Sequence, residues 1–174
     1  MNYNLIVAMC KNRGIGKNNT IPWYCKNDLK LFSKLTKGSG NNAIIMGRKT
    51  WESLPKKPLV NRTNIVISRT QKKSITNNVI IMNNIDEAVT YCNEMDFDET
   101  WVIGGSSIYK GFLDKCIINN IYMSYIDKLY DCDVYFPELE RNWKLIEEKH
   151  IEDDNLSFIL KILSHDYMKS NICN

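Results

Sequence analysis

Short apolar runs alternate with segments of helical periodicity over about the first two thirds of the chain, and strand-like runs follow one another after that. Several runs are continuously apolar, which is typical of strands covered on both faces. The pattern predicts strands over 4–10, 42–46, 63–68, 79–82, 100–103, 117–126, 133–136, 143–151 and 156–163, and helices over 27–37, 48–54, 85–93 and 106–113. Alternation followed by strands alone predicts an α/β sheet that is mostly parallel and closes with an antiparallel hairpin.

The predicted helix 27–37 carries one carboxylate on its apolar stripe. Leu31, Phe32 and Leu35 follow Asp28 at i+3, i+4 and i+7, so helical periodicity puts all four on one face. In one interpretation Asp28 is an acid in the first turn, where the helix dipole stabilises it by about 0.3–1 kcal/mol. In the other its partner is a ligand, because a carboxylate can accept two parallel hydrogen bonds from a planar N–C–N donor pair. The spacing leaves both interpretations open.

Two strand-to-helix turns carry the other candidate chemistry. Gly47 precedes Arg48, Lys49 and Thr50 at a helix start, where side chains and backbone N–H groups can converge on a phosphate. Residues 104–109 are Gly-Gly-Ser-Ser-Ile-Tyr, so the backbone can approach a ligand closely where a helix begins. A solvated basic turn and a tight serine-capped turn explain the same patterns. In a mostly parallel sheet, however, these turns lie beyond the carboxyl ends of strands, where such sheets bind ligands.

Composition and charge narrow the class of protein. The 174 residues, 44% hydrophobic and 25% charged, are typical of one globular domain. A net charge of +3 is too small to indicate a nucleic-acid or membrane partner. The six cysteines and two histidines show no C-x-x-C pair and no metal-ligand spacing, so we expect free thiols and no metal. Without a signal peptide or an apolar segment of about 20 residues, we expect a cytoplasmic protein.

Five stretches of the chain, taken in order, carry a family resemblance. They are Ile15-Gly16 with Ile21-Pro22-Trp23 and Asp28; Met-Gly-Arg-Lys-Thr-Trp-Glu-Ser at 46–53; Arg-x-Asn-Ile-Val-Ile-Ser-Arg at 62–69; Ile-Gly-Gly-Ser-Ser-Ile-Tyr at 103–109; and Asp-Val-Tyr-Phe-Pro at 133–137. Together they resemble the dihydrofolate reductases, over most of the chain. The resemblance implies a three-layer α/β fold formed by 1–174, with a mostly parallel eight-stranded sheet, an antiparallel C-terminal strand and flanking helices.

The resemblance also implies an activity and a site. The activity is reduction of 7,8-dihydrofolate to tetrahydrofolate by hydride transfer from NADPH, in a monomeric enzyme of one-carbon metabolism that antifolate-type inhibitors bind. The implied catalytic residues are Asp28, which binds the pterin, Trp23 and Ser124, which support its carboxylate directly or through water, and Tyr109. The implied substrate-binding residues are Ile6, Val7, Asp28, Leu29, Phe32, Leu54, Leu59, Arg62 and Ile103, with Arg62 pairing with the α-carboxylate of the glutamate tail. The implied cofactor-binding residues are Ala8, Ile15, Gly16, Gly47, Arg48, Lys49, Thr50, Ser68, Arg69, Gly104, Gly105, Ser106, Ser107, Ile108 and Tyr109, with a cis peptide bond between Gly104 and Gly105.

The chain departs from the family pattern at two positions. Ser124 replaces the usual threonine but keeps its hydroxyl, and Asn83 stands where many relatives place a basic residue near the cofactor's 2′-phosphate. Two alternatives are a catalytically lapsed folate- and NADPH-binding protein and a same-fold pyrimidine reductase of riboflavin synthesis. Asp28 and Arg62 disfavour the second, because its substrate has no glutamate tail. Some family members are fused to thymidylate synthase, and the 174 residues leave open whether the chain stands alone.

Overall fold

A nine-stranded sheet lies at the centre of the computed structural model, which describes residues 2–72, 74–76 and 78–165. The strand order is β10-β11-β8-β1-β7-β3-β4-β6-β5, and β2 and β9 form a separate two-stranded sheet. The strands are β1 (Tyr3–Cys10), β2 (Gly14–Gly16), β3 (Ala43–Gly47), β4 (Thr63–Ile67), β5 (Ser74–Thr76), β6 (Val79–Met82), β7 (Thr100–Gly104), β8 (Ile118–Ile126), β9 (Val134–Tyr135), β10 (Trp143–Ile151) and β11 (Phe158–His165).

The large sheet is parallel through its middle and antiparallel at its edges. The strands from β8 to β6 in this order are parallel neighbours. β11 runs antiparallel to β8, and β10 runs antiparallel to β11. These pairings confirm the mostly parallel sheet and its terminal hairpin. Eight strands match the expected number, and β5 adds a ninth, which pairs with the edge of β6 and is too short to show a hydrophobic pattern.

The stretch predicted as a strand over 133–136 does not join the large sheet. Its two-residue strand β9 pairs with the three-residue strand β2 instead. Asp133 N–H donates to the Gly16 carbonyl at 3.0 Å, and Asn18 N–H donates to Asp133 Oδ2 at 2.9 Å. The small sheet therefore fixes the segment after β1 beside the main sheet.

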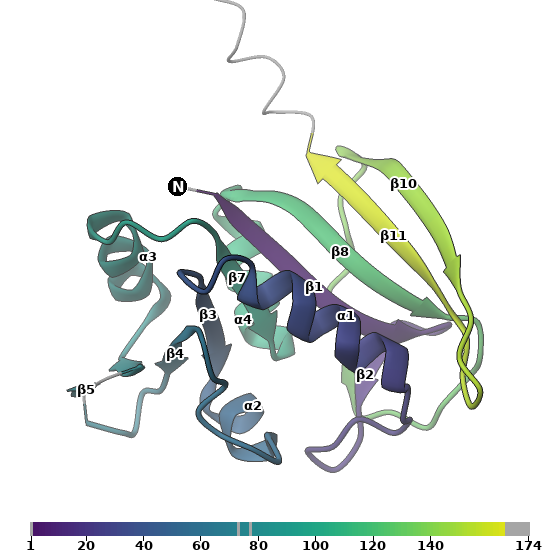
Figure 1. The fold of residues 1–174 in the computed structure, drawn as a ribbon, viewed down its shortest axis with the longest axis horizontal. Helices are drawn as coiled ribbons and strands as arrows, with labels where there is room; N and C mark the ends of the chain where they lie inside the picture. The colour runs from purple at the N-terminus through teal and green to yellow at the C-terminus, as the bar shows by residue number, and fades with distance from the viewer. Residues whose placement is uncertain (1, 73, 77, 166–174) are drawn as a thin grey trace, which may run out of the picture.

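Helices cover both faces of the large sheet. In the described residues they are α1 (Lys26–Lys37), α2 (Arg48–Ser53), α3 (Ile85–Glu94) and α4 (Ser106–Asp114), each within one residue of its predicted bounds. In Figure 1, α1 crosses in front of β1 and α4 lies behind the sheet. Ile6 packs in a cluster with Phe32 of α1, whereas Val7 packs in a second cluster with Phe112 of α4. Because successive side chains of a strand alternate between faces, β1 contributes to both cores.

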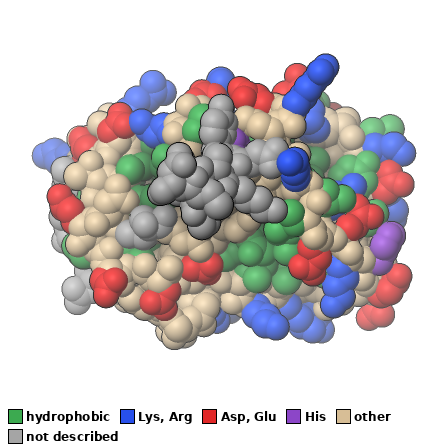
Figure 2. Space-filling model, turned by 90° about the horizontal axis from the view of Figure 1, so that it is seen from above, with side chains coloured by type: hydrophobic (Ala, Val, Ile, Leu, Met, Phe, Trp, Pro, Cys, Tyr) green, Lys and Arg blue, Asp and Glu red, His purple; other side chains and the backbone are tan. Residues whose placement is uncertain are grey.

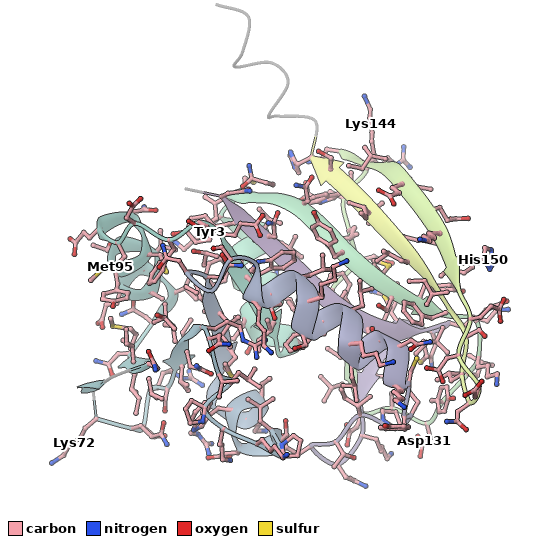
Figure 3. The ribbon with its side chains drawn as sticks, viewed as in Figure 1. Tyr3, Lys72, Met95, Asp131, Lys144 and His150 are labelled. Carbon is pink, nitrogen blue, oxygen red and sulfur yellow. The ribbon has the colours of Figure 1, made fainter. Side chains whose placement is uncertain are left out.

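Charged side chains of both signs lie on the face of the molecule that Figure 2 shows. On the face shown in Figure 2, acidic and basic side chains alternate without a continuous region of one sign, in keeping with the small net charge. Figure 3 shows Tyr3 at the start of β1, and its hydroxyl donates to Asn93 Oδ1 near the end of α3 at 3.0 Å. No helix in the described part of the chain is long and apolar enough to cross a membrane.

Candidate active site

The two central strands β1 and β7 separate toward their carboxyl ends. Within the described residues, their ladder runs only from Tyr3 to Leu5 on β1, opposite Thr100 to Val102 on β7. Beyond it, the buried Tyr109 hydroxyl of α4 donates to the Ile6 carbonyl at 2.8 Å. The opening between the strands is therefore bordered by β1 backbone on one side and the start of α4 on the other. This is the position at which α/β sheets bind ligands.

Asp28 lies in the first turn of α1, on the face that packs against the sheet. Burial raises the pKa of its carboxyl, and a hydrogen bond from the Ser124 hydroxyl opposes that shift. Ser124 is itself buried on β8, directly opposite Ala8 of β1. The Asp28 carboxyl is thus largely withdrawn from water beside the Ser124 hydroxyl, as expected of an acid whose partner is a ligand.

The start of α1 is held by the hairpin between β10 and β11. The N-cap residue Cys25 has no side-chain cap, and its thiol instead donates to the Leu156 carbonyl at 3.1 Å. Asp153 Oδ2 accepts a hydrogen bond from the Asn27 N–H at 2.8 Å, so it caps the helix from a distant part of the chain. These contacts fix the first turn, and with it the position of Asp28.

Trp23 and Tyr109 flank the acid in different ways. The Trp23 ring packs 5.0 Å from that of Tyr130, and its buried Nε1 has no hydrogen-bond partner among the described residues. The direct bond from Trp23 to Asp28, one of two routes considered from the sequence, is therefore not formed. Burial strongly raises the pKa of the Tyr109 hydroxyl, and the nearby charge of Asp28 adds to the shift.

The seven apolar residues expected to line the substrate do not all lie together. Five of them share one cluster with Trp51 and the front face of the sheet: Ile6, Phe32, Leu54, Leu59 and Ile103. Leu29 is 50% exposed on α1, one residue after Asp28, and remains accessible from outside. Val7 differs, because its side chain lies in the opposite core and only its backbone can face the site.

Arg62 is a buried cation at the other end of α1 from Asp28. Its guanidinium lies over the Phe32 ring at 5.9 Å, Nη1 donates to Thr36 Oγ1 at 2.6 Å, and Nε donates to the Val60 carbonyl at 3.2 Å. Burial lowers its pKa, but the group stays charged because an arginine begins far above neutrality. Asp28 and Arg62 therefore define two charged ends of one apolar wall.

The residues expected to meet the cofactor converge around two turns. Gly104 has φ +112°, and the peptide bond to Gly105 is cis, as the resemblance implied. A Cβ at Gly47 would lie 3.1 Å from Ile108 Cγ1, and one at Gly105 would lie 3.4 Å from Thr50 Oγ1, so the starts of α2 and α4 are neighbours. Neither helix has a side-chain N-cap, and the N–H groups at the start of α4 suit an anion such as a pyrophosphate.

The remaining cofactor candidates border these turns. Arg48 Nη1 pairs with Glu52 at 2.6 Å, and Lys49 and Ser107 are exposed at the two helix starts. Ser106 donates to the Tyr135 carbonyl at 2.6 Å, which joins α4 to the small sheet that carries Ile15 and Gly16. Ser68 is buried and accepts from the Gln71 N–H at 3.1 Å, whereas Arg69 is exposed. The residues present thus fit an extended, phosphate-bearing nucleotide across the carboxyl ends of the strands.

The sequence did not identify three residues that position the site. Thr36 contacts Arg62, and Asp153 caps the helix of Asp28. Asn64 has no measurable exposure, and its amide exchanges hydrogen bonds with both the N–H and the carbonyl of Leu59 at 2.9 Å. A threonine on the buried face of a helix and an asparagine inside an apolar strand were available signals, because buried polar groups require partners.

The sheet order, the buried acid and the adjoining glycine turns define an α/β protein with a ligand site at the carboxyl ends of its central strands. A model of the dihydrofolate reductase family matches residues 2–165. The dihydrofolate reductase of Heliothis virescens is 36% identical over 175 residues, covering 91% of this chain and 95% of that protein. That of Drosophila melanogaster is 33% identical over 177 residues, covering 94% and 97%. The chain belongs to the dihydrofolate reductase family.

A bifunctional relative also matches. The bifunctional dihydrofolate reductase-thymidylate synthase 2 of Arabidopsis thaliana is 39% identical over 150 residues. The match covers 79% of this chain but only 26% of that protein. The similarity is therefore confined to a part of the bifunctional protein.

Proposed function

We propose that the chain reduces 7,8-dihydrofolate to 5,6,7,8-tetrahydrofolate, with NADPH as the electron donor. The observation that carries the proposal is the Asp28 carboxyl on α1, whose pKa is raised by burial against the opposing effect of the Ser124 hydroxyl, and whose charge acts on Tyr109 beside the end of the β1–β7 ladder. Membership of the family supports the reaction, and a nicotinamide cofactor follows from that membership. The proposal also includes a preference for NADPH over NADH.

Asp28 binds and orients the pterin ring in this mechanism. Its carboxylate accepts hydrogen bonds from the 2-amino group and the adjoining ring nitrogen, which form a planar donor pair. Because burial raises its pKa, Asp28 also shares a proton with the ring more readily than a solvated aspartate does. The apolar wall that includes Ile6 and Phe32 keeps water from the ring.

The cofactor, when bound, supplies the hydride that the pterin accepts. The protein's contribution is to place it: Gly104, Gly105 and the N–H groups at the start of α4 would hold its pyrophosphate. The residues that would meet its nicotinamide are Ala8 of β1 and Ile15 and Gly16 of the small sheet. The exposed side chains of Lys49 and Arg69 favour a 2′-phosphate, which supports NADPH.

The test is the loss of NADPH absorbance on adding dihydrofolate to purified protein, with NADH and the Asp28→Asn variant measured in parallel. We expect oxidation of NADPH, slower oxidation of NADH, and a turnover in the variant that is severely reduced while NADPH binding is kept. Equal rates with the two cofactors would contradict the NADPH preference alone. Tight binding of both ligands without turnover would contradict the enzyme and indicate a lapsed binding protein.

A further inference from the structure

Thr36 is a fully buried hydroxyl between two functional parts of the site. It lies on α1 eight positions after Asp28 and has no measurable exposure. Its Oγ1 donates to the Phe32 carbonyl at 2.7 Å and accepts from Arg62 Nη1 at 2.6 Å. A hydroxyl has one proton and two acceptor lone pairs, so the bond to Phe32 directs an acceptor toward Arg62.

The backbone of Thr36 is fixed as well as its side chain. Asn42 Nδ2 donates to the Thr36 carbonyl at 3.2 Å, and Asn42 Oδ1 accepts from the Glu99 N–H at 3.1 Å. The helix end is therefore tied to the start of β3 and to the segment before β7. Because hydrogen bonds fix both the side chain and the backbone of Thr36, its hydroxyl oxygen accepts from Arg62 at a fixed position.

The contacts of Arg62 determine which of its donors remain for a ligand. A guanidinium has five N–H donors. One on Nη1 is used by Thr36 and the one on Nε by the Val60 carbonyl, while the face of the group lies over Phe32. The other three, one on Nη1 and two on Nη2, have no partner among the described residues. The two terminal nitrogens are thus left to bind a carboxylate through two parallel hydrogen bonds.

We propose that Thr36 is a positioning residue that orients the Arg62 guanidinium and so gives the site its selectivity for ligands with a carboxylate tail. The proposal rests on the proposed function, because it takes the tail of dihydrofolate as the partner of Arg62. Without the Thr36 acceptor, a buried N–H of Arg62 loses its partner, and the group gains freedom to turn toward another acceptor. The terminal nitrogens then no longer face the tail in a fixed geometry.

Two variants test this role. Thr36→Val removes the hydroxyl and keeps the branched shape, whereas Thr36→Ser keeps the hydroxyl and removes a methyl group. Dissociation constants are measured by quenching of tryptophan fluorescence for folate, which carries the glutamate tail, and for a 2,4-diaminopyrimidine without any carboxylate. The ratio of the two constants in one sample does not depend on the fraction of folded protein.

We expect Thr36→Val to weaken folate binding about tenfold or more, the weight of a hydrogen bond to a charged group, and to change diaminopyrimidine binding less than twofold. Thr36→Ser should restore most of the selectivity for folate. Equal weakening of both ligands, or Thr36→Ser behaving like Thr36→Val, would overturn the proposal, since either result indicates a structural role only. If Thr36→Val does not fold, Thr36→Ala takes its place as the variant without the hydroxyl, and its ratio of dissociation constants is compared with that of Thr36→Ser.

A double variant separates this proposal from the proposed function. In the Arg62→Gln background, adding Thr36→Val should leave the ratio of folate to diaminopyrimidine affinity unchanged, because the group that Thr36 orients is gone. A further tenfold loss there would show that Thr36 acts independently of Arg62. Failure of the unmodified protein to bind folate at all would contradict the proposed function itself, a result distinct from either outcome.

Discussion

Removing the Tyr109 hydroxyl tests how the opening between β1 and β7 is held. Tyr109→Phe keeps the ring, which is 4% exposed and packs edge-on against Phe136 at 5.2 Å. It deletes only the hydrogen bond of 2.8 Å to the Ile6 carbonyl. The net loss of such a bond is about 0.5–1.5 kcal/mol, and a buried carbonyl left without its donor raises the cost to about 1–3 kcal/mol.

The assay is equilibrium unfolding in urea, followed by tryptophan fluorescence. We expect a lower midpoint with an unchanged m-value, because the surface exposed on unfolding stays the same. The matching fall in Tm is about 2–4 °C for each kcal/mol in a chain of this size. Tyr24→Phe is the control, since Tyr24 is 62% exposed and its hydroxyl can bond to water. A loss below about 0.5 kcal/mol for Tyr109→Phe would refute the reasoning, because surface substitutions reach that size.

Three further predictions concern Asp28, Asp153 and Gly104. Burial raises the folded-state pKa of Asp28, so its ionisation opposes folding once the pH rises above the unfolded-state pKa. Asp28→Asn should therefore increase the free energy of unfolding in urea at pH 7. At pH 3, where the carboxyl is protonated in both states, the substitution should give no such increase. Hydrogen bonds from backbone N–H groups lower the pKa of Asp153, so its stabilising effect is present at pH 7 and lost in acid. Asp153→Ala should therefore lower Tm at pH 7. An equal fall in Tm at pH 3 would contradict the role of the Asp153 carboxylate as a cap of α1. A Cβ at Gly104 would lie 2.9 Å from the Tyr109 ring at φ +112°, whereas one at Gly40, with φ +107°, has no neighbour within 4 Å. Both alanine variants should lose about 1–3 kcal/mol through backbone strain, and Gly104→Ala should lose a further 1–3 kcal/mol or so through overpacking, which thermal unfolding of the pair would measure.

Hydrophobic periodicity was sufficient to predict most of the sheet and all of the described helices. Each helix begins and ends within one residue of its predicted bounds, because apolar stripes and glycines such as Gly38 mark them locally. The short strands β2, β5 and β9 escaped prediction as members of their sheets. Two or three residues are too few to show a period, so such pairings depend on neighbours distant in sequence.

Some residues of the candidate site could likewise be predicted from the sequence, and others could not. Asp28 was identified because an acid on an apolar stripe conflicts with the local pattern, and the structure places it in buried surroundings. The side chain of Val7 could have been assigned to the opposite face from that of Ile6, since neighbouring strand residues alternate. The bond between Thr36 and Arg62 joins residues 26 positions apart, and no periodicity reports a contact across that separation.

The acid and the structure that holds it are therefore specified by different parts of the chain. Burial raises the pKa of Asp28, and the position of this carboxyl depends on a first turn of α1 that contacts from elsewhere fix. Those contacts come from the β10–β11 hairpin, where Asp153 caps the helix across 126 positions and Leu156 accepts from Cys25 across 131. The terminal antiparallel hairpin thus does more than close the sheet. It carries the cap that α1 lacks in its own sequence, and it thereby holds the functional carboxylate in place.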